Sequence, residues 1–331
     1  GGISMTEYMG LDIKYTDCTE TGGSSYVVHV GHAMNAIAMG KCSVALVTLA
    51  GRPRAEGVAT LGTRDYGNTL PELGFEIPYG PVVTNMYGMA AMRHMHQYGT
   101  TSRQLAWIKV AASHHAQHNE RAMLRNVVTV EDVINSPIIS DPLHRLDCCV
   151  ISDGGGALVI VSPEIANTLG DRCIKILGHG EHIKHLNAGQ VDITYTGAVK
   201  SGPIAFEDAN LTPADIDYVS IYDSFTITVL ETLEDLGFCE KGDGGKLVSD
   251  GNLISGTGKL PFNTDGGGLC NNHPTNRGGI TKVIEAARQL RGEAHPKVQV
   301  PDCSLALAHG TGGSIGSRMG SSTVILGRND A

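Results

Sequence analysis

The fold class is decided by GGITKVIEAARQLRG (residues 278–292) and CSLALAHGTGG (303–313). The first stretch has apolar residues at helical spacing and ends at a glycine, which predicts an amphipathic helix. The second is a short apolar run that leads into a Gly-rich turn, which is typical of a buried strand. Together they predict a helix followed by a strand, as in α/β proteins.

A similar unit lies near the start of the chain. SSYVVHVGHAMNAIAMG (24–40) has helical spacing and a final glycine, and CSVALVTL (42–49) has the pattern of a buried strand. Each half also has a Gly-rich turn beside a Val-Ile strand, DGGGALVIV (153–161) and MGSSTVIL (319–326). This repetition predicts a duplicated α/β half-domain.

The middle of the chain differs from both halves. From about residue 66 to 146 the sequence is charged, histidine-rich and helical in pattern, which predicts an inserted, mainly helical lobe. We therefore expect a first half at 1–65, the inserted lobe at 66–146, a return to the first half at 147–165 and a second half at 166–331. The opening GGISMTEYMG has no signal-peptide pattern, and we expect it to begin inside a larger domain.

Composition excludes several classes of protein. The 331 residues are 41% hydrophobic, which argues against disorder, and the 43 glycines show no collagen-like period. The net charge of −9 disfavours binding to nucleic acid. No apolar run is long enough to span a membrane. Eight cysteines without a CxxC pair indicate free thiols in a reducing cytoplasm.

Two histidines lie in Gly-rich segments. His273 is in GGGLCNNHPTNRGG (266–279), where its imidazole would lie beside free backbone N–H groups, as in an oxyanion site. An ordinary loop histidine held by Pro274 is an equal alternative. His309 ends an apolar strand just before another Gly-rich turn. The repeated arrangement favours a role in catalysis for both.

Other polar residues follow strands or begin helices. Tyr222, Asp223 and Ser224 come after a predicted strand, where a phenol or carboxylate could orient a histidine or a water. For Asp223, a satisfied turn that caps the next helix is the more common role. Ser24 and Ser25 begin a helix, where either an exposed nucleophile or a plain cap is expected.

The helical lobe has a cluster of histidines, in HMH and HHAQH. A metal site is conceivable, but no carboxylate or cysteine stands at a matching spacing. We expect a solvated helix face and no metal.

The motifs together resemble the thiolase superfamily, especially the sterol-carrier-protein-type thiolases and thiolase-like aldolases. Residues 89–122 and 129–161 look like that family's loop lobe and returning strand. NNHP (271–274) resembles the GHP motif, YDSF (222–225) takes the place of NEAF or HDCF, and HGTGG (309–313) stands where others have C-x-G or HN-x-G. The likeness covers nearly the whole chain.

The resemblance implies a five-layered αβαβα fold, an acyl-CoA substrate and a homodimer. It also implies a small OB-fold partner protein with a zinc ribbon, and no cofactor beyond coenzyme A as part of the substrate. The family's opening strand-helix-strand is absent before Gly1. The family's nucleophilic cysteine should fall near residues 23–25, yet TETGGSSY (19–26) has none, and His309 takes the place of the second cysteine.

Without these thiols, we expect retro-aldol cleavage of a 3-hydroxyacyl-CoA, which needs no covalent intermediate. The resemblance places His273 in the oxyanion hole, Tyr222 or His309 as the base, and Asp223 as an orienting group. Contacts to substrate or CoA are expected from Ser24, Ser25, Ser224, Gly310 and Gly312. The alternatives are an acetyl-CoA acetyltransferase with a non-standard nucleophile and a non-catalytic scaffold that binds acyl-CoA or lipid.

Overall fold

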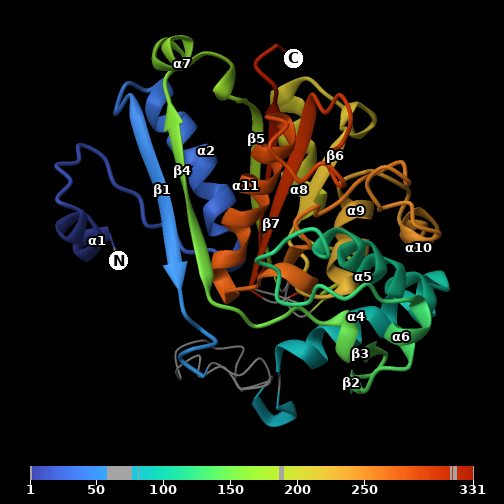
Figure 1. Ribbon diagram of the computed structural model, residues 1–331. Coiled ribbons are helices and arrows are strands. Elements are labelled where there is room, and N and C mark those ends of the chain that lie inside the picture. The colour runs from blue at the N-terminus through green and yellow to red at the C-terminus, as the bar shows by residue number, and fades with distance from the viewer. Residues whose placement is uncertain are drawn as a thin grey trace.

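Two β-sheets of unequal size form the frame of the molecule (Figure 1). The structure is a computed structural model that describes residues 2–57, 77–80, 82–185, 190–313, 315 and 319–330. The smaller sheet pairs β1 (Val44–Gly51) with β4 (Gly154–Val161) in antiparallel orientation. The larger sheet has the order β5-β8-β7-β6 in the described part of the chain, and its strands are β5 (Lys175–Lys184), β6 (Tyr218–Ile221), β7 (Leu305–Gly313) and β8 (Met319–Gly327).

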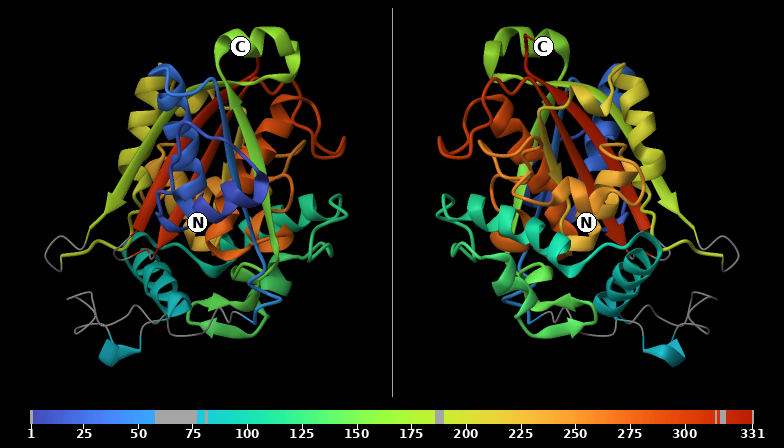
Figure 2. Two further views of the ribbon diagram at one scale, coloured as in Figure 1. Left: turned by 90° about the vertical axis from the view of Figure 1, so that its left-hand side faces the viewer. Right: turned by 90° about the vertical axis from the view of Figure 1, so that its right-hand side faces the viewer.

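Helices α2 (Ser25–Ala38) and α11 (Gly278–Leu290) lie side by side between the two sheets (Figures 1 and 2). Val27 of α2 packs against the larger sheet, whereas Ala33 packs against Val47 of the smaller sheet. A helix buried on two sides is apolar on most of its surface. This position explains why α2 contains no Asp, Glu, Lys or Arg.

Helices α8 (Ala198–Ala209) and α9 (Thr226–Asp235) cover the other face of the larger sheet. Successive residues of a strand point to opposite faces. Leu307 of β7 therefore packs toward α8 and α9, and Ala308 packs toward α2 and α11. Helix α1 (Gly2–Met9) lies beyond the smaller sheet, and none of its residues is buried (Figure 2).

A group of helices and a short hairpin lies below the sheets in Figure 1. Helix α4 (Val83–Tyr98) ends at Gly99, whose φ is 76°. Helix α5 (Ser102–Ala116) begins after Thr101, whose hydroxyl accepts a hydrogen bond from the backbone N–H of Gln104. The ring of Tyr87 in α4 stacks on Phe225, with centroids 4.5 Å apart. The group therefore shares a core with α9. Its elements are α4 (Val83–Tyr98), α5 (Ser102–Ala116), α6 (Val130–Ile134), β2 (Ile138–Ser140) and β3 (Leu143–His144).

Two further short α-helices, α7 (Pro163–Leu169) and α10 (Gly244–Val248), lie outside these groups. No helix in the described ranges is long and apolar enough to cross a membrane.

The repeated helix and strand units expected from the sequence are confirmed. The segments 24–49 and 278–313 form α2 with β1 and α11 with β7, and 153–161 and 319–326 form β4 and β8. Of the five layers that the resemblance implies, the described residues form four, in the order sheet, helices, sheet, helices. The expected boundary between residues 65 and 66 lies outside the described residues.

Every residue of α9 is buried, including three acidic ones. Glu234 accepts a hydrogen bond from His94 (2.9 Å), and Asp235 pairs with Lys241 (2.6 Å). Glu231 is 0% exposed, and neither of its carboxyl oxygens has a hydrogen-bond partner in the described part of the chain. Burial, opposed by Lys241 and reinforced by Asp235, raises the pKa of Glu231 well above its usual value.

We predict that Glu231→Gln removes a pH-dependent loss of stability. Above the ordinary Glu pKa the unfolded chain releases this proton while the folded chain keeps it, so wild-type stability falls by up to about 1.4 kcal/mol per pH unit until the folded pKa is reached. The amide does not titrate. Between pH 5 and 8, the melting temperature of the variant should therefore fall less than that of the wild type. Exposed Glu207→Gln is the control for net charge. If the melting temperatures of all three proteins fell equally between pH 5 and 8, the prediction would be contradicted.

Candidate active site

The loop that carries His273 begins with a tight turn. Gly266 and Gly267 have φ of 96° and 59°, in the left-handed region, and Gly267–Asn271 form a π-helical turn. A side chain at Gly267 would overlap the carboxylate of Asp223. The turn therefore requires glycine where it passes Asp223. We call residues 266–273 the His273 turn.

Asp223 holds the His273 turn from the end of β6. Its Oδ1 accepts hydrogen bonds from the backbone N–H of Gly268 (2.7 Å) and from Nζ of Lys282 (3.0 Å), and its Oδ2 accepts one from the N–H of Leu269 (3.0 Å). Burial disfavours the Lys282 ammonium, but Asp223 and Asp265 outweigh it and raise the pKa of Lys282. The sequence suggests that Asp223 orients a catalytic histidine or tyrosine, whereas the structure shows it orienting this turn.

Two buried residues that the sequence analysis misses also hold the turn. Lys109 of α5 donates a hydrogen bond to the carbonyl oxygen of Leu269 (2.6 Å), and the hydroxyl of Ser152 accepts one from the backbone N–H of His273 (3.0 Å). Lys109 and Leu269 are 160 positions apart in the chain. No local pattern could therefore have distinguished Lys109 from a surface lysine of an amphipathic helix.

The imidazole of His273 packs edge-on against the ring of Tyr222, with centroids 5.1 Å apart and planes at 70°. Its Nε2 is buried and has no hydrogen-bond partner in the described residues. Burial, helped by the positive charge of Lys282, lowers the pKa of His273 to about 4. The ring is therefore neutral at pH 7, and a neutral imidazole can donate one hydrogen bond to a carbonyl oxygen.

The ring of Tyr222 lies beside Gly23, in the segment where the resemblance places a nucleophilic cysteine. Its hydroxyl donates a hydrogen bond to the carbonyl of Thr275 (2.8 Å), and its ring lies against Gly23 and Gly278. A Cβ atom at Gly23 would be 2.6 Å from Cζ of Tyr222 and would also overlap the carbonyl of Thr311. Gly23, one of the three positions at which the family's cysteine is expected, has no room for a side chain.

The two serines beside Gly23 are also not exposed. Ser24 and Ser25 are 0% and 1% exposed. The hydroxyl of Ser24 donates to the carbonyl of Thr21 (2.7 Å), and that of Ser25 donates to the carbonyl of Gly22 (2.7 Å) and accepts from the N–H of Thr21 (2.8 Å). Neither serine is therefore an exposed nucleophile, because the turn uses both hydroxyls itself, and the expected contact to substrate stays a prediction.

His309 lies on the opposite face of the larger sheet from Tyr222. Its Nδ1 is 2.9 Å from the hydroxyl of Thr323, which is 3.0 Å from the hydroxyl of Ser201 in α8. Burial lowers the pKa of His309 to about 3. The structure does not bring His309 together with His273, and a catalytic role for His309 stays a prediction. One step along a strand turns a side chain to the other face, and His309 stands one residue away from the face of the site.

The other residues expected to contact substrate or CoA are Ser224, Gly310 and Gly312, and each packs against another part of the chain. The hydroxyl of Ser224 is 3.0 Å from that of Thr228. At Gly310 a Cβ atom would meet the backbone of residues 21–24 at 2.9 Å, and at Gly312 it would overlap the same segment. These glycines allow β7 to pass close to that turn, which places Thr311 beside Gly23.

Three cysteines lie in or next to the His273 turn. All eight cysteines of the chain are free. Burial raises the pKa of Cys148 to about 12 and also raises that of Cys149 and Cys270. Thiols with raised pKa values stay protonated at pH 7 and are poor nucleophiles. These cysteines do not supply the missing thiolate.

The prediction of a solvated histidine face is wrong for two of the five histidines. His94 is 0% exposed and lies between Thr100 (2.8 Å) and Glu234 (2.9 Å). His115 is 1% exposed, and its Nε2 accepts a hydrogen bond from the backbone N–H of Ser255 (2.9 Å). Within the described ranges, no group of three or more His, Cys, Asp or Glu side chains could hold a metal ion.

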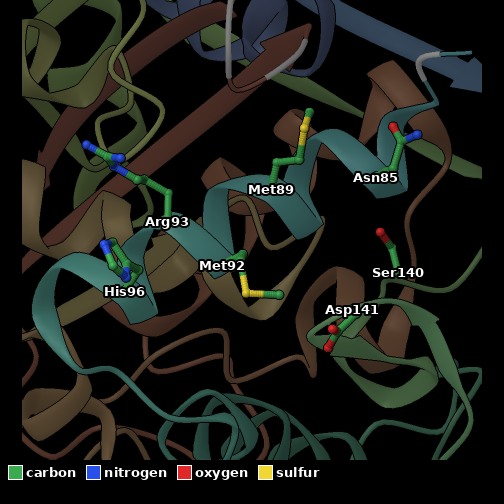
Figure 3. A pocket seen from close by; sticks show the side chains of 7 residues that line it. All are labelled: Asn85, Met89, Met92, Arg93, His96, Ser140 and Asp141. Atoms are coloured by element: carbon green, nitrogen blue, oxygen red, sulfur yellow. The ribbon is translucent and has the colours of Figure 1, made fainter. Parts of the chain in front are cut away.

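A pocket of about 430 Å³ lies on the outer side of α4, away from the His273 turn (Figure 3). None of the predicted catalytic or substrate-binding residues lines it, although His96 of the histidine cluster does. Two exposed methionines project from α4 into it, and the end of β2 closes its other side. The residues that line it are Asn85, Met89, Met92, Arg93, His96, Ser140 and Asp141.

Comparison with known proteins identifies relatives of this chain. Residues 180–328 match the family described as "Thiolase C-terminal domain-like". An acetyl-CoA acetyltransferase from Methanothermobacter thermautotrophicus is 38% identical over 251 residues, which are 75% of this chain and 65% of that protein. This chain thus spans just under two thirds of that relative. A steroid side-chain-cleaving aldolase from Thermomonospora curvata is 34% identical over 293 residues, 85% of this chain and 74% of the relative.

A solved structure supports the same assignment. The structure of the "Ltp2-ChsH2(DUF35) aldolase" aligns with a TM-score of 0.87 and 32% sequence identity, and the match covers 99% of this chain and 84% of that chain. The thiolase-like fold expected from the sequence motifs is therefore confirmed. The chain belongs to the thiolase superfamily.

Proposed function

We propose that this chain is an enzyme that cleaves a 3-hydroxyacyl-CoA by retro-aldol chemistry into a shorter acyl-CoA and a ketone or aldehyde. The observation that carries this proposal is the pairing of Tyr222 with His273 against Gly23. It combines a hydrogen-bond donor for a thioester carbonyl with a phenol, and it leaves no space for a nucleophile at Gly23. The relative named as a steroid side-chain-cleaving aldolase supports the same chemistry.

The reaction moves one proton and breaks one bond. A base removes the proton of the substrate's 3-hydroxyl, the C2–C3 bond breaks, and its electron pair forms the enolate of the thioester. His273 donates a hydrogen bond from its ring to the enolate oxygen. The enolate takes the proton at C2, so no proton is gained or lost overall. With His309 on the far face of the sheet, Tyr222 is the proposed proton-transfer group.

An acetyl-CoA acetyltransferase is the second candidate, because the first of the relatives described above carries that name. That reaction holds the acyl group on an enzyme thiolate. Gly23 carries no side chain, and the cysteines near the His273 turn have raised pKa values. A scaffold that only binds acyl-CoA is the third candidate.

Incubation of the purified protein with each substrate class, followed by mass spectrometry, separates the three candidates. We expect 3-hydroxyacyl-CoA to yield a shorter acyl-CoA and a carbonyl compound with no change in protein mass. A stable acyl adduct from 3-ketoacyl-CoA would instead support the acyltransferase. Binding of both substrates without any product would support the scaffold.

The partner and the cellular setting are part of the same proposal. Since the similar Ltp2-ChsH2 aldolase includes a DUF35 component, we propose that this chain also works with a small OB-fold partner protein that carries a zinc ribbon. We further propose a homodimer, no cofactor besides the coenzyme A of the substrate, and a cytoplasmic location, which the free thiols favour. The mass-spectrometric assay is therefore run with and without a copurifying partner.

We predict that His273→Ala lowers kcat/KM for cleavage by roughly 10²–10³-fold, the usual effect of losing one oxyanion donor. His273→Asn keeps an N–H donor and should retain more activity than the alanine variant. His96, exposed on α4, gives the control variant His96→Ala, whose kinetics should match the wild type. Steady-state kinetics with 3-hydroxyacyl-CoA measure all four proteins. Full activity of His273→Ala would exclude the oxyanion role.

We predict that Tyr222→Phe lowers kcat by roughly 10²–10⁴-fold, as expected when a proton-transfer group is removed. The ring still fills the space beside Gly23, so KM and the melting temperature should stay close to wild type. Tyr98→Phe is the control, because the hydroxyl of Tyr98 accepts a hydrogen bond from the neighbouring Gln97 in α4. Wild-type kcat in Tyr222→Phe would assign proton transfer to another group.

A further inference from the structure

Lys109 is a fully buried lysine of the helical lobe that has no carboxylate partner in the described part of the chain. It is 1% exposed, and none of the ion pairs among the described residues includes it. Its Nζ donates a hydrogen bond, 2.6 Å long, to the carbonyl oxygen of Leu269 and also contacts the thiol of the next residue, Cys270. Burying an amine is unfavourable unless its hydrogen bonds are made, and both of these contacts are to residues of the His273 turn.

The same short segment is held by a charged group from the opposite side. The N–H groups of Gly268 and Leu269 both donate to the carboxylate of Asp223, which in turn pairs with Lys282. The backbone at Leu269 is therefore fixed at its N–H by an anion and at its carbonyl by a cation. Charge-assisted hydrogen bonds are shorter and stronger than neutral ones, and both of these are buried.

Leu269 lies four residues before His273, within one compact turn. Between them, the N–H of Cys270 donates to Gly266 (3.0 Å) and the N–H of Asn272 donates to Gly267 (3.1 Å). Because these internal bonds join the residues between Leu269 and His273 into one turn, we expect a displacement at Leu269 to reach His273. A shift of about 1 Å in a positioning group can reduce a reaction rate 10²-fold.

We propose that Lys109 is a positioning residue, which ties the helical lobe to the His273 turn and so fixes the imidazole of His273 for its partner oxygen. Lys109 touches the backbone of the turn and no reacting atom. The catalytic part of this inference rests on the proposed cleavage of 3-hydroxyacyl-CoA, whereas the structural part does not.

Two variants of similar size test the contact. Lys109→Met keeps the length of the side chain and loses the donor and the charge. Lys109→Gln keeps an N–H donor without the charge. Val110→Ala is the matched control, because Val110 is buried on the same helix in a different cluster, with Ala106, Val130 and Val133. It weakens the lobe without touching the His273 turn.

Amide hydrogen exchange of the protein, with its partner where one copurifies, measures how firmly the turn is held, and it needs no substrate. In Lys109→Met we expect exchange at residues 268–273 to be about 10-fold faster or more, with β6 and β7 unchanged. Lys109→Gln should restore most of the protection. Val110→Ala should lower the melting temperature about as much as Lys109→Met does, but exchange in its turn should match that of the wild type. Unchanged exchange in Lys109→Met would overturn the proposal.

Kinetics with 3-hydroxyacyl-CoA provide the second readout. We expect kcat of Lys109→Met to fall on the order of 10²-fold with KM within about twofold, and Lys109→Gln to recover most of kcat. Equal loss in Val110→Ala would show a general effect of lobe stability and overturn the specific role of Lys109. A wild type that does not cleave the substrate would refute the proposed function, while the exchange experiment would still decide whether Lys109 holds the turn.

Discussion

The geometry of the site depends on the buried ion pair between Asp223 and Lys282. One carboxylate takes three donors there, two backbone N–H groups and an ammonium, and almost no water reaches it. Removing either partner would leave an uncompensated charge in the interior. Because Asp223 follows β6 and Lys282 lies on α11, the pair joins the larger sheet to the central helices and to the His273 turn. The frame of the fold, more than the loop itself, thus sets where His273 lies.

Much of this arrangement could be predicted from the sequence, and the failures have a common physical cause. The periodicity of residues 24–49 and 278–313 revealed the helices and strands of both halves, and the motifs around Tyr222 and His273 led to two residues that do lie together. The position of His309 was not predicted, because motif spacing does not show which face of a strand a residue occupies. Lys109 was missed because the carbonyl that it binds is distant in the chain.

The helical lobe is joined to the second half by polar contacts as well as by a common core. His94 of α4 is hydrogen-bonded to Glu234 of α9, and Lys109 of α5 to Leu269. An apolar interface tolerates small shifts, whereas a buried hydrogen bond is lost when its atoms move by a fraction of an ångström. These contacts therefore fix the position of the lobe relative to the site, and the shared hydrophobic core stabilises the interface between them.

The mutual exclusion between Gly23 and the ring of Tyr222 also limits how this chain could change its chemistry. A cysteine at residue 23 has no space while the tyrosine remains, and a smaller residue at 222 leaves a void and no phenol while the glycine remains. The two positions are therefore coupled: a thiol at residue 23 would require both to change, together with a shift of the Thr311 carbonyl, which the same Cβ atom would overlap.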